Sequence, residues 1–205
     1  VDAVGFSMLG YVILFSFITG LAGAYEGKLI LQLIYLKRKL KKPVFRILWV
    51  GLAGVALAFM FYFNKDAAFG PGKEVMINIL FKTGEQESSI WLLLSRYFGA
   101  IISYTTGIAG GVFATSLSSG SIIGELLMDL FNLPHENKLL ILVAMIGFLT
   151  GLTRAPFTSS ILVLEMTDRH SAIFMFILAG LISSVAARLI DKKSLYERLE
   201  WNYLR

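Results

Sequence analysis

Cysteine is absent from the 205 residues, so the chain can form no disulfide, and a protein embedded in a lipid bilayer needs none. Charged residues are also scarce: they make up 16% of the chain, whereas a typical soluble domain has about a quarter. Hydrophobic residues make up 56%, and the mean hydropathy is +0.71. The sequence therefore predicts a membrane protein and not a soluble domain.

Two function classes are excluded by missing residues. The glycine-rich stretch at residues 107–111 is not followed by Gly-Lys-Ser/Thr and has no strand before it, so it is not a nucleotide-binding phosphate loop. The net charge of +5 comes from basic residues at the ends of apolar segments. Such a distribution is typical of membrane loops, and no nucleic-acid partner is expected.

Five apolar runs are long enough to approach or cross about 30 Å of hydrocarbon. They are residues 6–24, 45–63, 90–108, 139–152 and 173–187. Several contain a glycine or a charge, and some are too short to cross the bilayer unaided. Short and interrupted helices are typical of transporter cores, so we predict an all-α membrane protein with broken and half-spanning helices.

The basic residues predict the orientation of these helices. The densest basic cluster, KRKLKK at residues 37–42, follows the first apolar run, and Lys192, Lys193 and Arg198 follow the last. Lys and Arg accumulate on the cytoplasmic side of membrane proteins. We therefore expect the 37–42 loop and the C-terminus to be cytoplasmic, with the loop at residues 64–73 on the opposite face.

Gly107, Gly110 and Gly111 interrupt an apolar stretch just before a new helix near Val112. Glycines this close together end the preceding helix, and the first N–H groups of the next helix have no partner within it. Inside a bilayer each such group costs several kcal/mol unless something binds it. A helix N-terminus also carries about half a positive charge. The stretch therefore predicts a binding site for a small anion.

Three charged residues within or beside apolar segments have more than one interpretation. Arg96 is either paired inside the protein or directed to the membrane surface. Glu125 and Glu165 are possible proton carriers, but Glu165 is expected in an ion pair with Arg154 or Arg169, and Glu125 in packing or at the interface.

Small residues recur four positions apart in several segments, which favours close helix packing over ligand binding. The sets are Gly23/Gly27, Ser116/Gly120/Gly124, Gly147/Gly151 and Gly180/Ser184. For the same reason we assign no ligand to Ser116, Ser118, Ser119 or Ser121, whose hydroxyls can bond to the preceding helical turn.

Three sequence blocks resemble conserved blocks of CLC chloride channels and transporters. Residues 110–114, GGVFA, resemble the family's glycine-x-phenylalanine-x-proline signature. Residues 154–158, RAPFT, with 161–168, ILVLEMTD, resemble the next block, and 193–196, KSLY, resemble the short final helix. The resemblance implies a fold of two inverted repeats, of which residues 1–205 are the second, ending in a cytoplasmic-side helix at about 192–200.

The resemblance also implies an anion site. By position, the amides of Val112 and Phe113 and the hydroxyl of Tyr196 would bind the anion. No cofactor, metal site or catalytic residue is implied, since the family transports ions and is not enzymatic. Thr115 occupies the family's proline position, which leaves anion selectivity open.

The same resemblance implies the wider context of the chain. We expect chloride transport, coupled to protons as in the family's antiporters, in the inner membrane of a bacterium. The expected partners are the N-terminal half of the fold, which carries the family's gating and proton glutamates, and a second copy of the chain. Apolar faces at residues 157–164 and 173–182 would form the homodimer contact. The chain begins without methionine and is expected to be an excerpt without a regulatory domain.

Other functions stay open at this point. A passive voltage-gated chloride channel, or a member that carries another anion such as fluoride, fits the same residues. A structural membrane subunit is an alternative of a different class. An intramembrane serine protease is the least favoured, with Ser119 as nucleophile and His135 or His170 as the only available bases.

Overall fold

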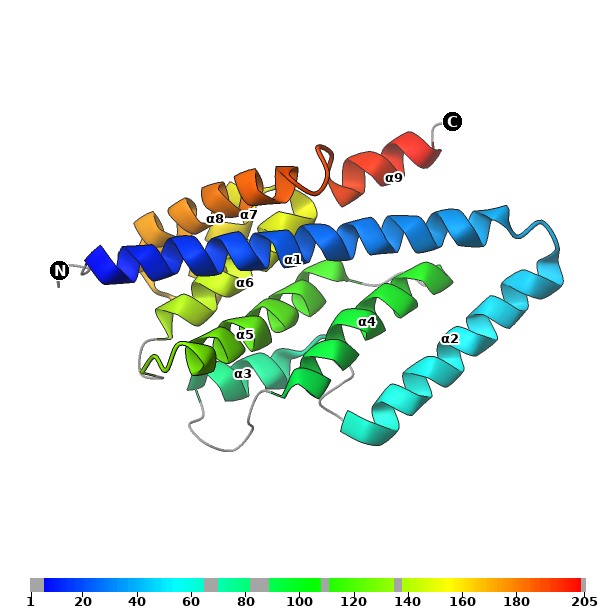
Figure 1. Ribbon diagram of the computed structural model, residues 1–205, viewed down its shortest axis with the longest axis horizontal. Coiled ribbons are helices and arrows are strands. Elements are labelled where there is room, and N and C mark those ends of the chain that lie inside the picture. The colour runs from blue at the N-terminus through cyan, green and yellow to red at the C-terminus, as the bar shows by residue number, and fades with distance from the viewer. Residues whose placement is uncertain (1–5, 65–69, 82–88, 108–110, 135–137, 204–205) are drawn as a thin grey trace.

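The computed structural model describes residues 6–64, 70–81, 89–107, 111–134 and 138–203, and across these ranges the regular structure is helical without strands. Figure 1 shows the arrangement. The elements are α1 (Phe6–Lys39), α2 (Pro43–Asn64), α3 (Lys73–Phe81), α4 (Ile90–Thr106), α5 (Val112–Leu130), α6 (Leu139–Thr153), α7 (Pro156–Thr167), a 3₁₀ turn η2 (His170–Ala172), α8 (Ile173–Arg188) and α9 (Leu195–Tyr203).

The centre of the fold is α6, whose residues from Leu140 to Leu152 are all buried. It packs against α1, α5 and α8. A helix that is apolar on every side needs a protein or lipid neighbour on every side, and here other helices provide it. The long helix α1 crosses the whole molecule in front of α6, while α2 diverges from it at one end (Figure 1).

Helix lengths agree with the prediction of full and partial spans. At 1.5 Å per residue, the 34 residues of α1 extend about 50 Å, well beyond about 30 Å of hydrocarbon. By length and composition, the helical stretches Met8–Lys39, Pro43–Tyr62 and His170–Arg188 are able to cross a membrane. The 15 residues of α6 and the 12 of α7 extend only about 22 and 18 Å.

Local capping residues explain two of the helix starts. Ser89 caps α4 by accepting a hydrogen bond from the Trp91 N–H at 3.2 Å. Ser194 accepts one from the Glu197 N–H at 3.1 Å, and the Glu197 carboxylate accepts one from the Ser194 N–H at 3.4 Å. This reciprocal pair starts α9 at Leu195, three residues after the start expected from the resemblance.

Glycine allows the closest approach between helices. A Cβ at Gly23 on α1 would collide with the backbone carbonyl oxygen of Phe148 on α6, and a Cβ at Gly151 would collide with that of Gly20. A Cβ at Gly120 on α5 would lie 2.7 Å from the nearest backbone atom of α6. The prediction that small residues serve packing is confirmed at these positions.

Arg154, at the end of α6, takes a structural role that the sequence did not predict. Its Nη2 donates hydrogen bonds to the carbonyl oxygens of Ala187, at 2.6 Å, and Asp191, at 2.7 Å. Ala187 lies in the last turn of α8 and Asp191 lies three residues beyond the helix, so Arg154 ties the end of α6 to the end of α8 and the segment that follows it. The expected ion pair of Glu165 with Arg154 or Arg169 is wrong, because Arg154 is committed to α8 and no ion pair joins Glu165 to either arginine in the described part of the chain.

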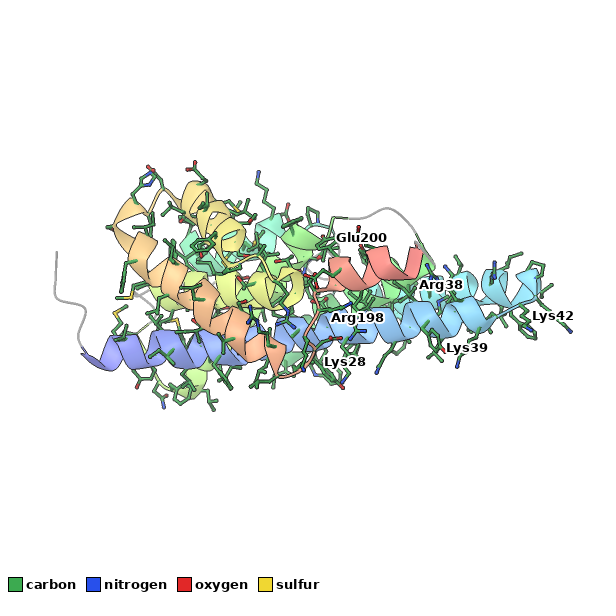
Figure 2. The ribbon with its side chains drawn as sticks, turned by 90° about the horizontal axis from the view of Figure 1, so that it is seen from above. Lys28, Arg38, Lys39, Lys42, Arg198 and Glu200 are labelled. Carbon is green, nitrogen blue, oxygen red and sulfur yellow. The ribbon has the colours of Figure 1, made fainter. Side chains whose placement is uncertain are left out.

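Basic side chains spread from the middle of the molecule to one end, along the last third of α1, the loop after it, and α9, which packs against α1 (Figure 2). Those that Figure 2 labels are Lys28, Arg38, Lys39, Lys42 and Arg198. The two segments expected to share the cytoplasmic side are therefore neighbours in space, although the side itself stays a prediction.

We expect a Gly23→Ala substitution to destabilise the assembled protein by about 1–3 kcal/mol, because α1 and α6 must separate to admit the methyl group. Gly10→Ala is the matched control on the same helix, since a Cβ there has nothing within 4 Å. Thermal unfolding in detergent measures both. Equal melting temperatures for the two variants would show that this close contact is not important for stability.

The absence of cysteine makes the orientation directly testable. Single Lys39→Cys and Lys193→Cys variants place thiols on exposed residues at the basic end, and Lys73→Cys places one at the start of α3. A membrane-impermeant thiol reagent is expected to label the first two only from the cytoplasmic side and the third only from outside. Labelling of Lys39→Cys and Lys193→Cys from opposite sides would contradict the topology.

Candidate anion-binding site

The chain breaks between α4 and α5 as predicted. Gly107 ends α4 with φ 87°, a left-handed conformation that favours glycine. Gly111 precedes α5 with φ −78° and ψ 123°, so it needs no glycine-specific conformation, and Gly110 lies outside the described residues. The N-cap residue of α5, Gly111, has no side chain with which to cap the helix, in contrast to Ser89 at α4, and no other described side chain caps it. The first N–H groups of α5 are therefore not bound by a capping side chain.

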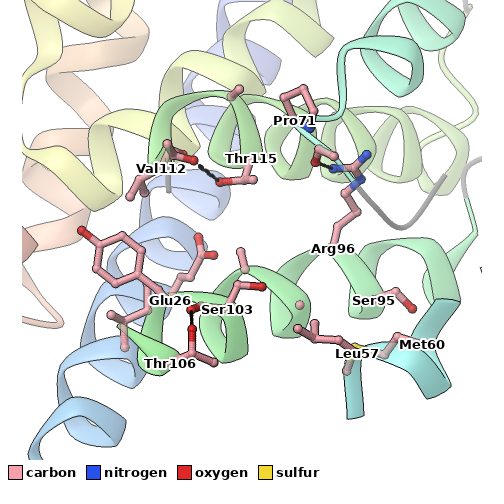
Figure 3. Close-up of a pocket in the computed structure, with 17 residues that line it drawn as sticks. Glu26, Leu57, Met60, Pro71, Ser95, Arg96, Ser103, Thr106, Val112 and Thr115 are labelled. Atoms are coloured by element: carbon pink, nitrogen blue, oxygen red, sulfur yellow. Dashed lines mark hydrogen bonds between the residues drawn. The ribbon is translucent and has the colours of Figure 1, made fainter. Parts of the chain in front are cut away.

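A cavity of about 480 Å³ lies at this uncapped start (Figure 3). Its walls come from α1, α2 and α4, from the residues that lead into α3, and from the first turn of α5. From α5 and its cap, the lining residues are Gly111, Val112, Ala114 and Thr115. The cavity adjoins a helix N-terminus, and such a terminus favours negative charge.

The hydroxyl groups of α5 mostly point back onto the helix. Thr115 Oγ1 donates to the Val112 carbonyl at 2.9 Å, and Ser116 Oγ donates to the same carbonyl at 2.7 Å. Ser118 and Ser121 bond to the preceding turn in the same way. These contacts are consistent with the prediction that the three serines bind no ligand. Ser119 differs, because its buried Oγ has no hydrogen-bond partner among the described residues.

Arg96 forms part of the opposite wall of the cavity. The side chain is 4% exposed, and Nη1 donates a hydrogen bond to the Gly70 carbonyl at 2.9 Å. Of the two interpretations left open by the sequence, the inward-facing and paired one is correct. The guanidinium also holds the segment before α3 against α4, because Gly70 precedes α3.

Glu26 is the residue at this cavity that sequence reasoning did not single out. It lies on α1, is 2% exposed, and its Oε2 atom has no hydrogen-bond partner in the part of the chain that the structure describes. Figure 3 shows its side chain reaching toward the cavity near Ser103 and Val112. The sequence could have indicated it, because an acidic residue within a long apolar helix is a candidate for function.

The three site residues expected from the resemblance have different positions. Val112 lines the cavity and is 7% exposed. Phe113 follows it, with a side chain that is 43% exposed and does not line the cavity. Tyr196 is 40% exposed and does not line it either. Tyr104, on α4, does line the cavity.

The Tyr196 hydroxyl stays neutral near physiological pH. Burial raises its pKa, and the nearby phenol of Tyr104 raises it further. Its neighbour Leu195 belongs to a buried apolar cluster that also contains Val112 and Ile30. Residues at the starts of α9 and α5 thus belong to one apolar cluster, although these two helix starts are more than 80 residues apart in sequence.

The protease alternative has no support in the described residues. Ser119 is fully buried and its Oγ contacts no base. His170 lies on the surface, where its Nε2 is 2.9 Å from an Asp168 carboxylate oxygen. His135 lies outside the described residues. Nucleophilic catalysis needs a base within hydrogen-bond reach of the serine, and the structure brings none there.

Comparison with known proteins identifies the family. The family described as voltage gated chloride channel matches residues 2–188, so the chain belongs to the CLC family of voltage-gated chloride channels and transporters. The resemblance seen in the sequence is therefore confirmed.

The fold has a solved counterpart. The crystal structure of a CLC-type fluoride/proton antiporter superposes with a TM-score of 0.78 at 16% sequence identity, covering 97% of this chain and 48% of that one. The chain thus spans about half the length of this relative. At this identity the likeness shows the fold alone, and it confirms a CLC-like, all-helical fold of which this chain forms one part.

Proposed function

We propose that this chain forms the C-terminal half of a transmembrane pathway for chloride or a similar small anion. The amides of Val112 and Phe113 and the hydroxyl of Tyr196 are the proposed ligands. The observation that carries the proposal is the uncapped start of α5 at a cavity, in a member of the CLC family.

The chemistry of this site suits transport. The N–H groups in the first turn of α5 carry a partial positive charge and leave the anion free to depart. A fully charged ligand would bind it more tightly and slow its release. Arg96 lines the same cavity, but its Nη1 is engaged with Gly70. The proposed ligands are accordingly neutral donors.

A second half of the fold is the proposed partner of this chain. Only 6% of the most apolar stretch of α2 is buried inside the protein. Large apolar side chains on α2 are exposed, among them Val44, Ile47 and Val55, although Leu57 and Met60 of the same helix line the cavity. Lipid and the N-terminal half of the fold would cover these side chains and complete the pathway.

Chloride/proton antiport is the mode we propose. Support comes from membership of the family and from the fold shared with a CLC-type fluoride/proton antiporter. Fluoride is the alternative substrate, and a passive channel is the alternative mode. Titration of the assembled protein with each anion, and the number of protons moved per anion in liposomes, distinguish these possibilities.

Tyr196→Phe removes one hydroxyl donor and keeps the ring. Loss of a hydrogen bond to a charged partner costs about 1.5–3 kcal/mol, so chloride affinity is expected to fall by about one to two orders of magnitude. Tyr196→Ala also removes the ring, which is expected to open the entrance and loosen any coupling to protons. Calorimetric chloride titration of the assembled protein measures the affinity of both variants.

The contrasting role for Tyr196 is that of an aromatic anchor at the membrane surface. An anchor can lose its hydroxyl without any effect on anion binding. Wild-type chloride affinity in both variants would therefore remove Tyr196 from the site and leave the start of α5 as its proposed remainder.

A homodimer through α7 and α8 is also part of the proposal. The two helices are neighbours and carry exposed apolar side chains, including Phe157, Ile161, Ile173 and Phe174. Ile173→Trp is expected to shift the assembled protein toward monomer in detergent, as measured by light scattering coupled to size-exclusion chromatography. An unchanged dimer would place Ile173 outside the contact.

A further inference from the structure

Glu26 is an ionisable group buried inside a membrane-spanning helix, with no described contact that explains it. Its Oε2 atom has no hydrogen-bond partner among the described residues. An unpaired carboxylate in an apolar interior is costly, whereas the protonated acid is far less so. A residue kept at this cost within α1 is a candidate for function.

The position of Glu26 connects it to the proposed anion site. It lines the same cavity as Val112 at the uncapped start of α5, and Figure 3 shows its carboxyl group on the side that faces Ser103 and Val112. A negatively charged carboxylate and an anion in this one cavity repel each other. A protonated carboxyl does not repel the anion, and its O–H is a donor that faces the cavity.

Among the described residues, Glu26 is the only acid that lines the cavity. From α4, Arg96 and Tyr104 line the cavity, and Tyr97 donates its hydroxyl to the Ala22 carbonyl at 3.1 Å. On α1 itself, Tyr25 is half exposed, and Lys28 lines a separate small pocket with Arg154 and Asp191.

The remaining helices packed against α1 add no acid at the cavity. Helix α6 has no ionisable side chain. The acids of α5 lie in its C-terminal half, α8 contributes a single arginine at its end, and the ionisable residues of α9 do not line the cavity. In chain order these residues are Glu125, Asp129, Arg188, Tyr196, Glu197, Arg198 and Glu200.

We propose that Glu26 is a proton-binding site linked to the anion at the start of α5. The carboxylate accepts a proton from water when the anion enters, forming an O–H bond, and returns the proton to water when the anion leaves. This inference rests on the proposed function, and it places one proton site in the C-terminal half of the pathway. A glutamate that only fills space would not exchange a proton with anion binding.

The test is the pH dependence of chloride affinity in the assembled protein. Binding linked to one proton makes the wild-type affinity fall by about tenfold per pH unit as the pH rises through the titration of Glu26. Glu26→Gln imitates the neutral acid, so it is expected to bind as the wild type does at acidic pH and to lose this slope. Glu165→Gln, on the exposed surface of α7, is the matched control and is expected to keep it.

Proton uptake on chloride addition, followed with a pH indicator in weakly buffered detergent solution, gives an independent readout. The wild type is expected to take up one proton more than Glu26→Gln, and Glu26→Asp is expected to restore uptake because it keeps a carboxyl at the cavity. The same slope and uptake in Glu26→Gln as in the wild type would overturn the inference while leaving the anion site in place. Loss of uptake in both Glu26 variants would overturn it too, since it would indicate a packing role. Absence of any chloride or fluoride binding to the wild type would overturn the proposed function itself.

Discussion

The constraint on which this structure depends is that backbone polar groups inside hydrocarbon need partners. A helix that begins within the protein interior exposes N–H groups, and one that ends there exposes carbonyls. The chain meets this constraint differently at different helix ends. Where α8 ends, the guanidinium of Arg154 donates to the Ala187 carbonyl in the last turn and to the Asp191 carbonyl just beyond the helix. At the start of α7, Pro156 has no N–H to satisfy.

We propose that at the start of α5 a ligand meets this constraint. Gly107 ends α4 in a left-handed conformation, no side chain caps α5, and a cavity adjoins the exposed turn. Close packing of α5 and α1 on α6 keeps this turn in place, because glycines allow backbone contact between the helices. Rigid surroundings matter at such a site, since donors that are already oriented need no reorganisation when the ion arrives.

The sequence was sufficient for the features that depend on local patterns. Apolar run length predicted the spans, and Gly107 predicted the break before α5. The small residues at four-residue spacing predicted close packing without naming the partner helix. Three ordered motifs predicted the family, because their spacing is specific to it.

Local sequence patterns carry no information about contacts between distant segments. Arg96 binds Gly70, which is 26 residues away, and Arg154 binds carbonyls more than 30 residues away. Nothing in the neighbourhood of either arginine specifies these partners, and for Arg154 the charge suggested Glu165 instead. Glu26 was visible as an acid in an apolar helix, but its place at the cavity follows only from the packing of α1 against α4 and α5.

The central claim is that an anion binds at the start of α5, and a heavier halide tests it most directly. A crystal structure of the assembled protein grown with bromide, recorded at the bromine absorption edge, would locate the ion by its anomalous signal. The account predicts a peak within hydrogen-bond distance of the Val112 and Phe113 amides. Bromide bound elsewhere in the pathway, with the cavity at the start of α5 holding none, would contradict it.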